Sequence, residues 1–204
     1  MKAHLFRLLL ISIITICEAS AQSNKSASSP PPIPSQPADE IRSLTKALAG
    51  TWSTTEKYEP LFLTPDGGTG AGEQVFRAGP GGFTLLENYH TKTTAGELFG
   101  FGLLWWDQGK GLQHMWCINV YPTGCEMFPP PPQPSPKWDG KQLVIHIEQE
   151  QQGQKMIWHE AISEITSKSY TQTIDIGDAP DHMQRWLTMH ARRVANVESK
   201  NAGR

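Results

Sequence analysis

The chain has 204 residues, of which 38% are hydrophobic and 19% charged, and its formal net charge is −2. A chain of this length is typical of one domain or of two very small ones. It has 18 basic against 20 acidic residues, and without a basic excess the composition argues against a nucleic-acid-binding protein. Seven Trp, seven Phe and four Tyr supply bulk for a core, which excludes a wholly disordered chain.

Residues 1–21 have the pattern of a secretory signal peptide. Lys2 and Arg7 give a positive start, a short apolar stretch follows, and Ala19-Ser20-Ala21 supplies the small residues that signal peptidase needs. The apolar stretch is shorter than the ~20 residues of a transmembrane helix. We therefore expect cleavage after Ala21, a periplasmic or secreted protein, and no membrane span in the mature chain. The alternative is a lipoprotein acylated at Cys17, although no small residues precede that cysteine as in a lipobox.

A Ser/Pro-rich stretch, residues 22–38, is expected to be a disordered tether. The folded domain is expected to span residues 39–195, with a disordered tail at 196–204. Asp39 is a candidate N-cap of a short helix, because Ile41, Leu44 and Leu48 follow at helical spacing. Gly50 is well placed to end that helix.

From residue 50 to residue 194 the pattern is that of short β-strands separated by turns. Ten strands are expected, at residues 50–58, 72–78, 83–92, 97–107, 112–121, 125–128, 141–151, 155–165, 169–176 and 183–194. Consecutive strands with mostly tight turns and no helix between them predict an antiparallel up-and-down arrangement. Closure into a barrel would remove the exposed edges. The sequence therefore predicts a mainly β fold, a barrel of about ten strands with one short N-terminal helix, and a β-sandwich is the alternative.

Signal cleavage would leave two cysteines, Cys117 and Cys125. An extracytoplasmic compartment permits a disulfide between them. However, a three-residue turn at Pro122-Thr123-Gly124 would place them too far apart along a hairpin for a bridge. A disulfide and two buried thiols are therefore both open at this point.

The strand expected at residues 97–107 is apolar on both faces. Its Gly100 and Gly102 share one face, which either bends the strand or leaves space in the interior. If one face lines the interior, the other is expected to be covered by the helix, by a loop or by a partner subunit. A homodimer is one such arrangement.

Several short motifs occur in the order of a known family. Leu48-Ala49-Gly50-Thr51-Trp52 is similar to the L-x-G-x-W start of calycin-like barrels. Gly81-Gly82-Phe83 with Glu87 and Tyr89, and later the end of the strand at residues 101–107, resemble the bacterial domain-of-unknown-function family numbered 1579. The resemblance covers residues 39–194 and implies a calycin-like barrel, similar to lipocalins or nitrobindins. The family has no established chemistry, so it implies no catalytic residue.

The candidate ligand-binding residues are those expected to line the barrel interior. Alternation places every second residue from Phe83 to Tyr89 on one strand face. Trp106 shares a face with the two glycines of its own strand. The expected lining is Phe83, Leu85, Glu87, Tyr89, Trp106 and Trp116. Glu87 is the expected polar anchor, and burial requires that it be hydrogen-bonded or neutral.

No cofactor and no metal site are expected. None of the histidines after residue 21 pair at the spacing of a local metal motif. Haem is the alternative cofactor, because Met189-His190-Ala191-Arg192-Arg193 resembles the end of nitrobindins, in which a histidine of the last strand ligates haem. The first strand lacks the repeated glycines of nitrobindins, so His190 is a haem ligand only under that alternative.

The sequence has no phosphate-binding loop, nucleophile elbow, H-E-x-x-H or paired C-x-x-C motif. We therefore expect an exported barrel that binds a small apolar or amphipathic molecule without catalysis. One alternative is a cavity enzyme, an isomerase or a haem-dependent detoxifier with Glu87 or His159 as acid or base. Another is a filled barrel that serves as a dimeric interaction module.

Overall fold

The computed structural model describes residues 36–62, 64–119, 126–128, 134–151 and 154–195. One helix, α1 (Asp39–Leu48), precedes the strands, and a 3₁₀ turn, η1 (Pro80–Gly82), lies between β2 and β3. The strands are β1 (Gly50–Tyr58), β2 (Gly68–Ala78), β3 (Thr84–Thr93), β4 (Gly96–Asp107), β5 (Gly111–Asn119), β6 (Glu126–Phe128), β7 (Lys137–Trp138), β8 (Leu143–Gln151), β9 (Gln154–Ser163), β10 (Ser169–Gly177) and β11 (Gln184–Arg193).

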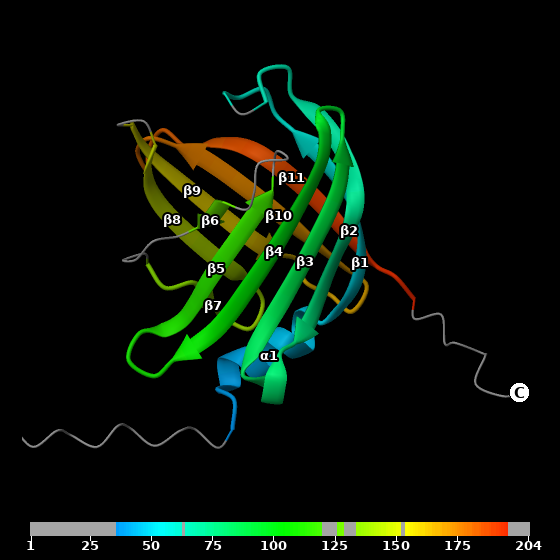
Figure 1. Cartoon of the computed structure of the whole chain (residues 1–204), viewed down its shortest axis with the longest axis vertical. Coiled ribbons are helices and arrows are strands. Elements are labelled where there is room, and N and C mark those ends of the chain that lie inside the picture. Colours follow the sequence, from blue (N-terminus) through cyan, green and yellow to red (C-terminus); the bar gives the residue numbers. More distant parts are fainter. Residues whose placement is uncertain (1–35, 63, 120–125, 129–133, 152–153, 196–204) are drawn as a thin grey trace, which may run out of the picture. The chain divides into compact units, whose positions relative to one another are not determined.

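The described strands form one antiparallel sheet in the order β6-β5-β4-β3-β2-β1-β11-β10-β9-β8-β7. The first and last strands, β1 and β11, lie side by side in the middle of this order, and the sheet curls into a nearly closed barrel (Figure 1). The predicted mainly β barrel with one helix is confirmed, and the sandwich is wrong. Each of the ten expected strands has a counterpart, whereas the two-residue β7 was not expected.

Alternation along the strands defines an interior face and an outer face. On β1 the residues from Trp52 to Tyr58 are alternately buried and exposed, and β10 alternates in the same way between buried and half-buried positions. Every second residue of a strand points to the same side. The buried set therefore lines the interior of the barrel.

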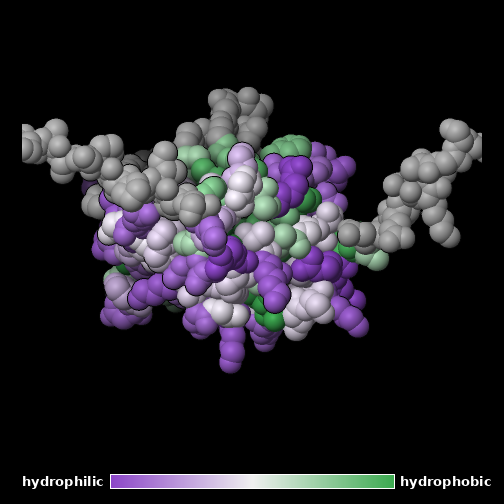
Figure 2. Space-filling model, turned by 90° about the horizontal axis from the view of Figure 1, so that it is seen from below, coloured by the Kyte–Doolittle hydropathy of each residue, from purple (hydrophilic) through white to green (hydrophobic). Residues whose placement is uncertain are grey.

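Helix α1 closes one end of the barrel. Its Ile41, Leu44 and Leu48 are fully buried in the same apolar cluster as Trp52 of β1. The Trp52 indole donates a hydrogen bond to the Leu48 carbonyl oxygen at 2.8 Å, and the Arg193 guanidinium lies 4.0 Å from the centre of the Trp52 ring. From this end, the exposed surface is largely hydrophilic with isolated hydrophobic side chains (Figure 2).

Both expected ends of the helix are shifted by one residue. Ala38, not Asp39, is the N-cap residue, and it makes no side-chain cap. Asp39 lies in the first turn instead, where its negative charge interacts favourably with the positive end of the helix dipole. It also forms an ion pair with Arg42. At the other end the helix ends at Leu48 with Ala49 as its C-cap residue, and Gly50 already begins β1 with a φ of 142° that favours glycine.

The outer face of β4 is apolar and exposed. Phe99 is 48% and Phe101 38% exposed, and their neighbours Leu103 and Trp105 on the same face are half-buried. Of the three expected covers of this face, namely the helix, a loop or a partner subunit, the helix is contradicted, because α1 packs under the end of the barrel. A homodimer stays a prediction.

Cys117 lies on the outer face of β5 and is disulfide-bonded. Cys125 lies outside the described residues, so the pairing of the two cysteines stays a prediction. The expected signal peptide, most of the tether and the tail also lie outside the described residues. Within the described part of the chain, no helix has the length and apolar character of a membrane span.

Candidate functional site

A layer of buried polar side chains lies inside the barrel. The Gln74 side-chain amide donates to the Glu87 carboxyl and also to Oε1 of Gln172, at 3.4 Å. The Gln172 amide in turn donates to Oε1 of Glu160 at 2.8 Å. The Tyr170 hydroxyl donates to Oε1 of Gln74. These five residues come from β2, β3, β9 and β10, so the chain of hydrogen bonds connects two glutamates across four strands.

The two carboxyl groups of this layer are poor acids because they are buried. Burial raises the pKa of Glu87 to about 7, although the hydrogen bond from Gln74 acts in the opposite direction. Burial and, next, the charge of Glu87 hold the pKa of Glu160 well above its ordinary range. The pKa of Tyr170 is raised by burial and by both glutamates. The pair therefore retains at least one proton at neutral pH.

Glu87 lies across a glycine of the neighbouring strand. Register places Glu87 of β3 opposite Gly102 of β4, and Gly102 opposite Trp116 of β5. A Cβ at Gly102 would lie 2.7 Å from Oε2 of Glu87, and one at Gly100 would lie 3.3 Å from the Tyr89 ring. Of the two expected consequences of these glycines, a bent strand or empty interior space, the empty space is contradicted, because the side chains of Tyr89 and Glu87 occupy it.

A second buried carboxyl group has the same arrangement. Glu56 of β1 pairs with Gly70 of β2, where a Cβ would lie 2.5 Å from Oε2 of Glu56. Three hydroxyls donate to the Glu56 carboxylate: Thr54 at 3.1 Å, Tyr58 at 2.7 Å and Thr91 at 2.9 Å. Because its oxygens are already well supplied with donors, Glu56 contributes to the stability of the interior rather than offering a free group to a ligand.

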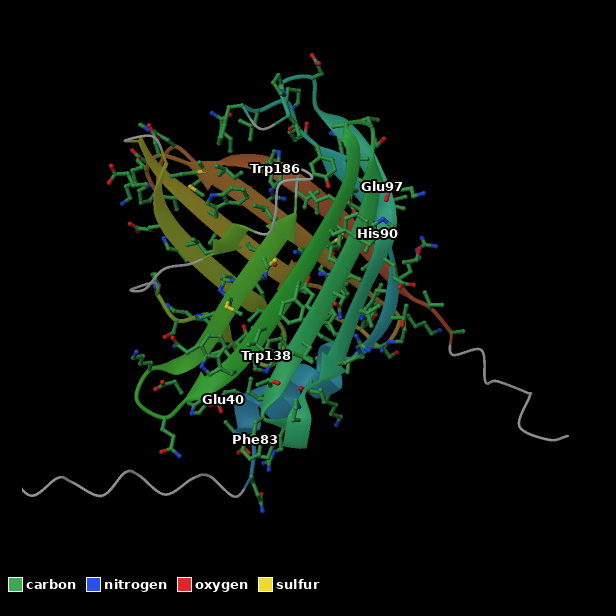
Figure 3. The ribbon with its side chains drawn as sticks, in the orientation of Figure 1. Glu40, Phe83, His90, Glu97, Trp138 and Trp186 are labelled. Carbon is green, nitrogen blue, oxygen red and sulfur yellow. The ribbon has the colours of Figure 1, made fainter. Side chains whose placement is uncertain are left out.

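Aromatic side chains surround the end of the interior away from α1. Trp186 contacts Tyr58 and Trp158 with ring centroids 5.5 Å apart in each pair, and its indole donates to Thr64 Oγ1 at 3.0 Å. Figure 3 shows Trp186 at this end of the barrel, opposite Phe83 at the helix end. Tyr89, Trp158 and Trp186 pack against the core yet remain half-buried. Such partial exposure indicates that solvent reaches part of these side chains.

Three buried ring nitrogens have no hydrogen-bond partner among the described residues: His114 Nε2, Trp116 Nε1 and Trp158 Nε1. His114 is 7% exposed, and burial lowers its pKa to about 4, so the imidazole is neutral at neutral pH. Its ring lies 5.9 Å from that of Trp116, the next inward residue of β5. Unpartnered buried donors and acceptors are usually satisfied by a ligand or by ordered water.

Five of the six expected lining residues are brought together. Leu85 and Glu87 are buried in the interior, and Tyr89, Trp106 and Trp116 pack against its apolar cluster. Their role in ligand binding stays a prediction.

Phe83 is the exception, and its expected position is wrong. It is 39% exposed and follows the 3₁₀ turn η1, so β3 begins only at Thr84. With φ −75° and ψ −12° its backbone is helical, not extended, and the alternation of β3 does not apply to it.

His190 and His159 do not belong to the interior. His190 is exposed on the outer face of β11 and lies 3.4 Å from Thr171 Oγ1. His159 lies on the outer face of β9 beside Asp175. The structure therefore contradicts His190 as a ligand of a haem inside the barrel. Among the residues that the structure describes, no group of three or more His, Cys, Asp or Glu is arranged to hold a metal ion.

Of the buried polar side chains, only Glu87 was predicted from the sequence. Gln74, Glu160, Gln172 and His114 each stand at an inward position of a strand that otherwise buries apolar residues, as at Ile162 beside Glu160. A polar residue in phase with the buried positions of a strand was the available signal. On β2, β5, β9 and β10 the inward face is known only once the sheet has closed, because alternation alone does not say which of the two faces is the interior.

No protein-family model matches the chain, and a search of curated proteins found no match. Among solved structures, the chain is similar to Rv2717c from M. tuberculosis, with 12% identity and a TM-score of 0.43 over 78% of this chain and 100% of that one. It is also similar to the designed barrel EF1p2_mFAP2b bound to DFHBI, with 15% identity and a TM-score of 0.40 over 76% and 99% of the two chains. At these TM-scores the likeness carries no conclusion about what this chain binds.

Proposed function

We propose that the barrel binds a small, largely apolar molecule in its interior, without catalysis, and that the protein is exported. The observation that carries the proposal is that three buried ring nitrogens, those of His114 and Trp116 on β5 and of Trp158 on β9, have no hydrogen-bond partner among the described residues. A buried donor without an acceptor costs about 1–3 kcal/mol. A ligand with hydrogen-bonding groups and an apolar body would offset this cost and cover the half-buried rings.

Native mass spectrometry of the mature protein purified from its own host tests the proposal. We expect a retained small mass that is lost on denaturation. A protein that carries no added mass and takes up no neutral fluorescent probe, such as 1-aminoanthracene, would contradict ligand binding.

Two tryptophan variants locate the probe. Trp158 points into the interior on β9, whereas Trp105 lies on the outer face of β4. We expect Trp158→Ala to weaken the binding of the probe by about tenfold, which corresponds to about 1.4 kcal/mol. Trp105→Ala, the matched control, should leave the affinity unchanged. Equal effects of the two variants would place the probe outside the interior.

A further inference from the structure

The ionisable members of the buried polar set are three carboxyl groups and one imidazole. Among the described residues, the buried polar side chains are those of Thr54, Glu56, Gln74, Glu87, Thr91, His114, Glu160 and Gln172. The list holds three glutamates and no Lys or Arg. Because like charges repel strongly in a medium of low dielectric constant, this interior disfavours an anionic ligand and favours a cation.

Each of the two glutamates that Gln74 and Gln172 link lies near an indole ring whose N–H has no partner among the described residues. Trp116 stands in the row of Glu87, with only Gly102 between them. Trp158 is the inward residue next to Glu160 on β9. A cation is attracted by the face of an aromatic ring as well as by a carboxylate. The same molecule would therefore meet both kinds of partner.

His114 supplies an independent indication of a ligand. Its side chain is 7% exposed, points inward from β5, and leaves Nε2 without a partner among the described residues. Burial lowers the pKa of His114 to about 4, so at neutral pH the imidazole has one nitrogen with a free lone pair. Such a nitrogen can accept a hydrogen bond from an ammonium group.

We propose, building on the proposed function, that the ligand is an organic ammonium ion with an aromatic or apolar body. Its charged nitrogen lies at Glu87, and its body packs on the rings of Trp116 and Trp158. No covalent bond changes other than the O–H bond of one carboxyl group, whose proton passes to solvent. Near neutral pH, the carboxyl pair of Glu87 and Glu160 releases the proton that it holds to solvent as the ligand's charge enters.

The coupling to protons follows from the groups around Glu87. The titratable groups whose charge interacts with that of Glu87 are Glu160 from β9 and Tyr170 from β10. Tyr89 is the next inward residue of the same strand as Glu87, and His114 is buried on the inward face of β5. Burial raises the pKa of both tyrosines and lowers that of His114, which leaves all three neutral. The proton therefore comes from the carboxyl pair, and the affinity for an ammonium ion rises as the pH rises.

Three probes of similar size and different charge test the proposal by isothermal titration calorimetry: 2-phenylethylammonium, 2-phenylethanol and 3-phenylpropanoate. We expect the ammonium to bind at least about tenfold more tightly than the alcohol, and the carboxylate not to bind. Between about pH 5.5 and about pH 7.5 the affinity for the ammonium should rise several-fold. Titrations in two buffers of different ionisation enthalpy should show release of about one proton for each ammonium bound.

The variant Glu87→Gln should lose both the preference for the ammonium and the proton release while it still binds the alcohol. Glu73→Gln, on the outer face of β2, is the matched control and should behave as the parent protein. If Glu87→Gln does not fold, the proton release of the parent protein decides by itself. Equal binding of ammonium and alcohol without proton release overturns the cation and leaves the proposed function intact. Failure of all three probes to bind overturns both.

Discussion

At the scale of single residues, burial changes the acid–base chemistry of the interior in two opposite directions. It raises the pKa of Glu87 to about 7 and lowers that of His114 to about 4. In both cases water is replaced by protein, which disfavours the charged form. Both side chains are therefore held neutral in the folded protein at pH values at which they would be charged in the unfolded chain.

Replacement of Glu87 by Gln should change how stability depends on pH. In the parent protein the folded state holds a proton that the unfolded chain releases above about pH 4.5, so stability falls from there to about pH 7. As the pH rises through this range, the free energy of unfolding of Glu87→Gln should therefore increase by about 3 kcal/mol relative to that of the parent protein. Urea unfolding at a series of pH values measures the difference. Glu73→Gln is the control, and a pH-independent difference for Glu87→Gln would contradict the prediction.

Replacement of His114 by Gln should change the pH dependence of stability in the opposite sense. In the unfolded chain His114 binds a proton below about pH 6.5, whereas in the folded protein it does so only below about pH 4. Between these values the unfolded state binds more protons, so the stability of the parent protein falls as the pH falls. As the pH falls between these values, the free energy of unfolding of His114→Gln should rise by up to about 3 kcal/mol relative to that of the parent protein. The control is His190→Gln, at an exposed position of β11. The same urea series decides, and a gain that appears on the alkaline side instead would show the assignment to be wrong.

At the scale of elements, α1 belongs to the barrel core although it is a short helix outside the sheet. Three of its residues are fully buried, and the Arg193 guanidinium donates to the carbonyl oxygens of Ala47 in the last turn and of the C-cap residue Ala49. Isolated helices of this length are unstable in water. The helix is therefore held by its contacts with the end of the barrel.

Leu44→Ala should lower the free energy of unfolding by about 2–5 kcal/mol, because it opens a cavity at a fully buried position. Lys46→Ala, at an exposed position of the same helix, should change it by less than about 0.5 kcal/mol. Thermal and urea unfolding measure both. If the two variants were equally stable, α1 would not be part of the cooperative core.

At the scale of the whole molecule, residues 1–21 are expected to be removed as a signal peptide. N-terminal sequencing of the exported protein should begin at Gln22, because Ala19 and Ala21 are the small residues that signal peptidase recognises. Ala21→Phe should accumulate the uncleaved precursor, whereas Ser20→Phe, at the unrestricted middle position, should be processed. A mature protein that retains Met1, or one acylated at Cys17, would contradict the prediction.

The sequence by itself determined the strands, the helix and the class of fold. Hydrophobic alternation and turn residues are local signals, and they located β1 at both ends and most other strands to within a few residues. Phe83 shows where a local signal fails, because the backbone of a 3₁₀ turn interrupts an alternation that looks continuous in the sequence.

Only the tertiary structure decided what lies inside the barrel. Gln74 and Gln172 are 98 positions apart, and their hydrogen bond depends on the curvature and register of the closed sheet. Gly102 is needed because Glu87 of another strand lies across it. Hydrogen bonding of this kind depends on neighbours in space. The alternation along one strand can indicate that a polar residue points inward, but not which polar residue of another strand it meets.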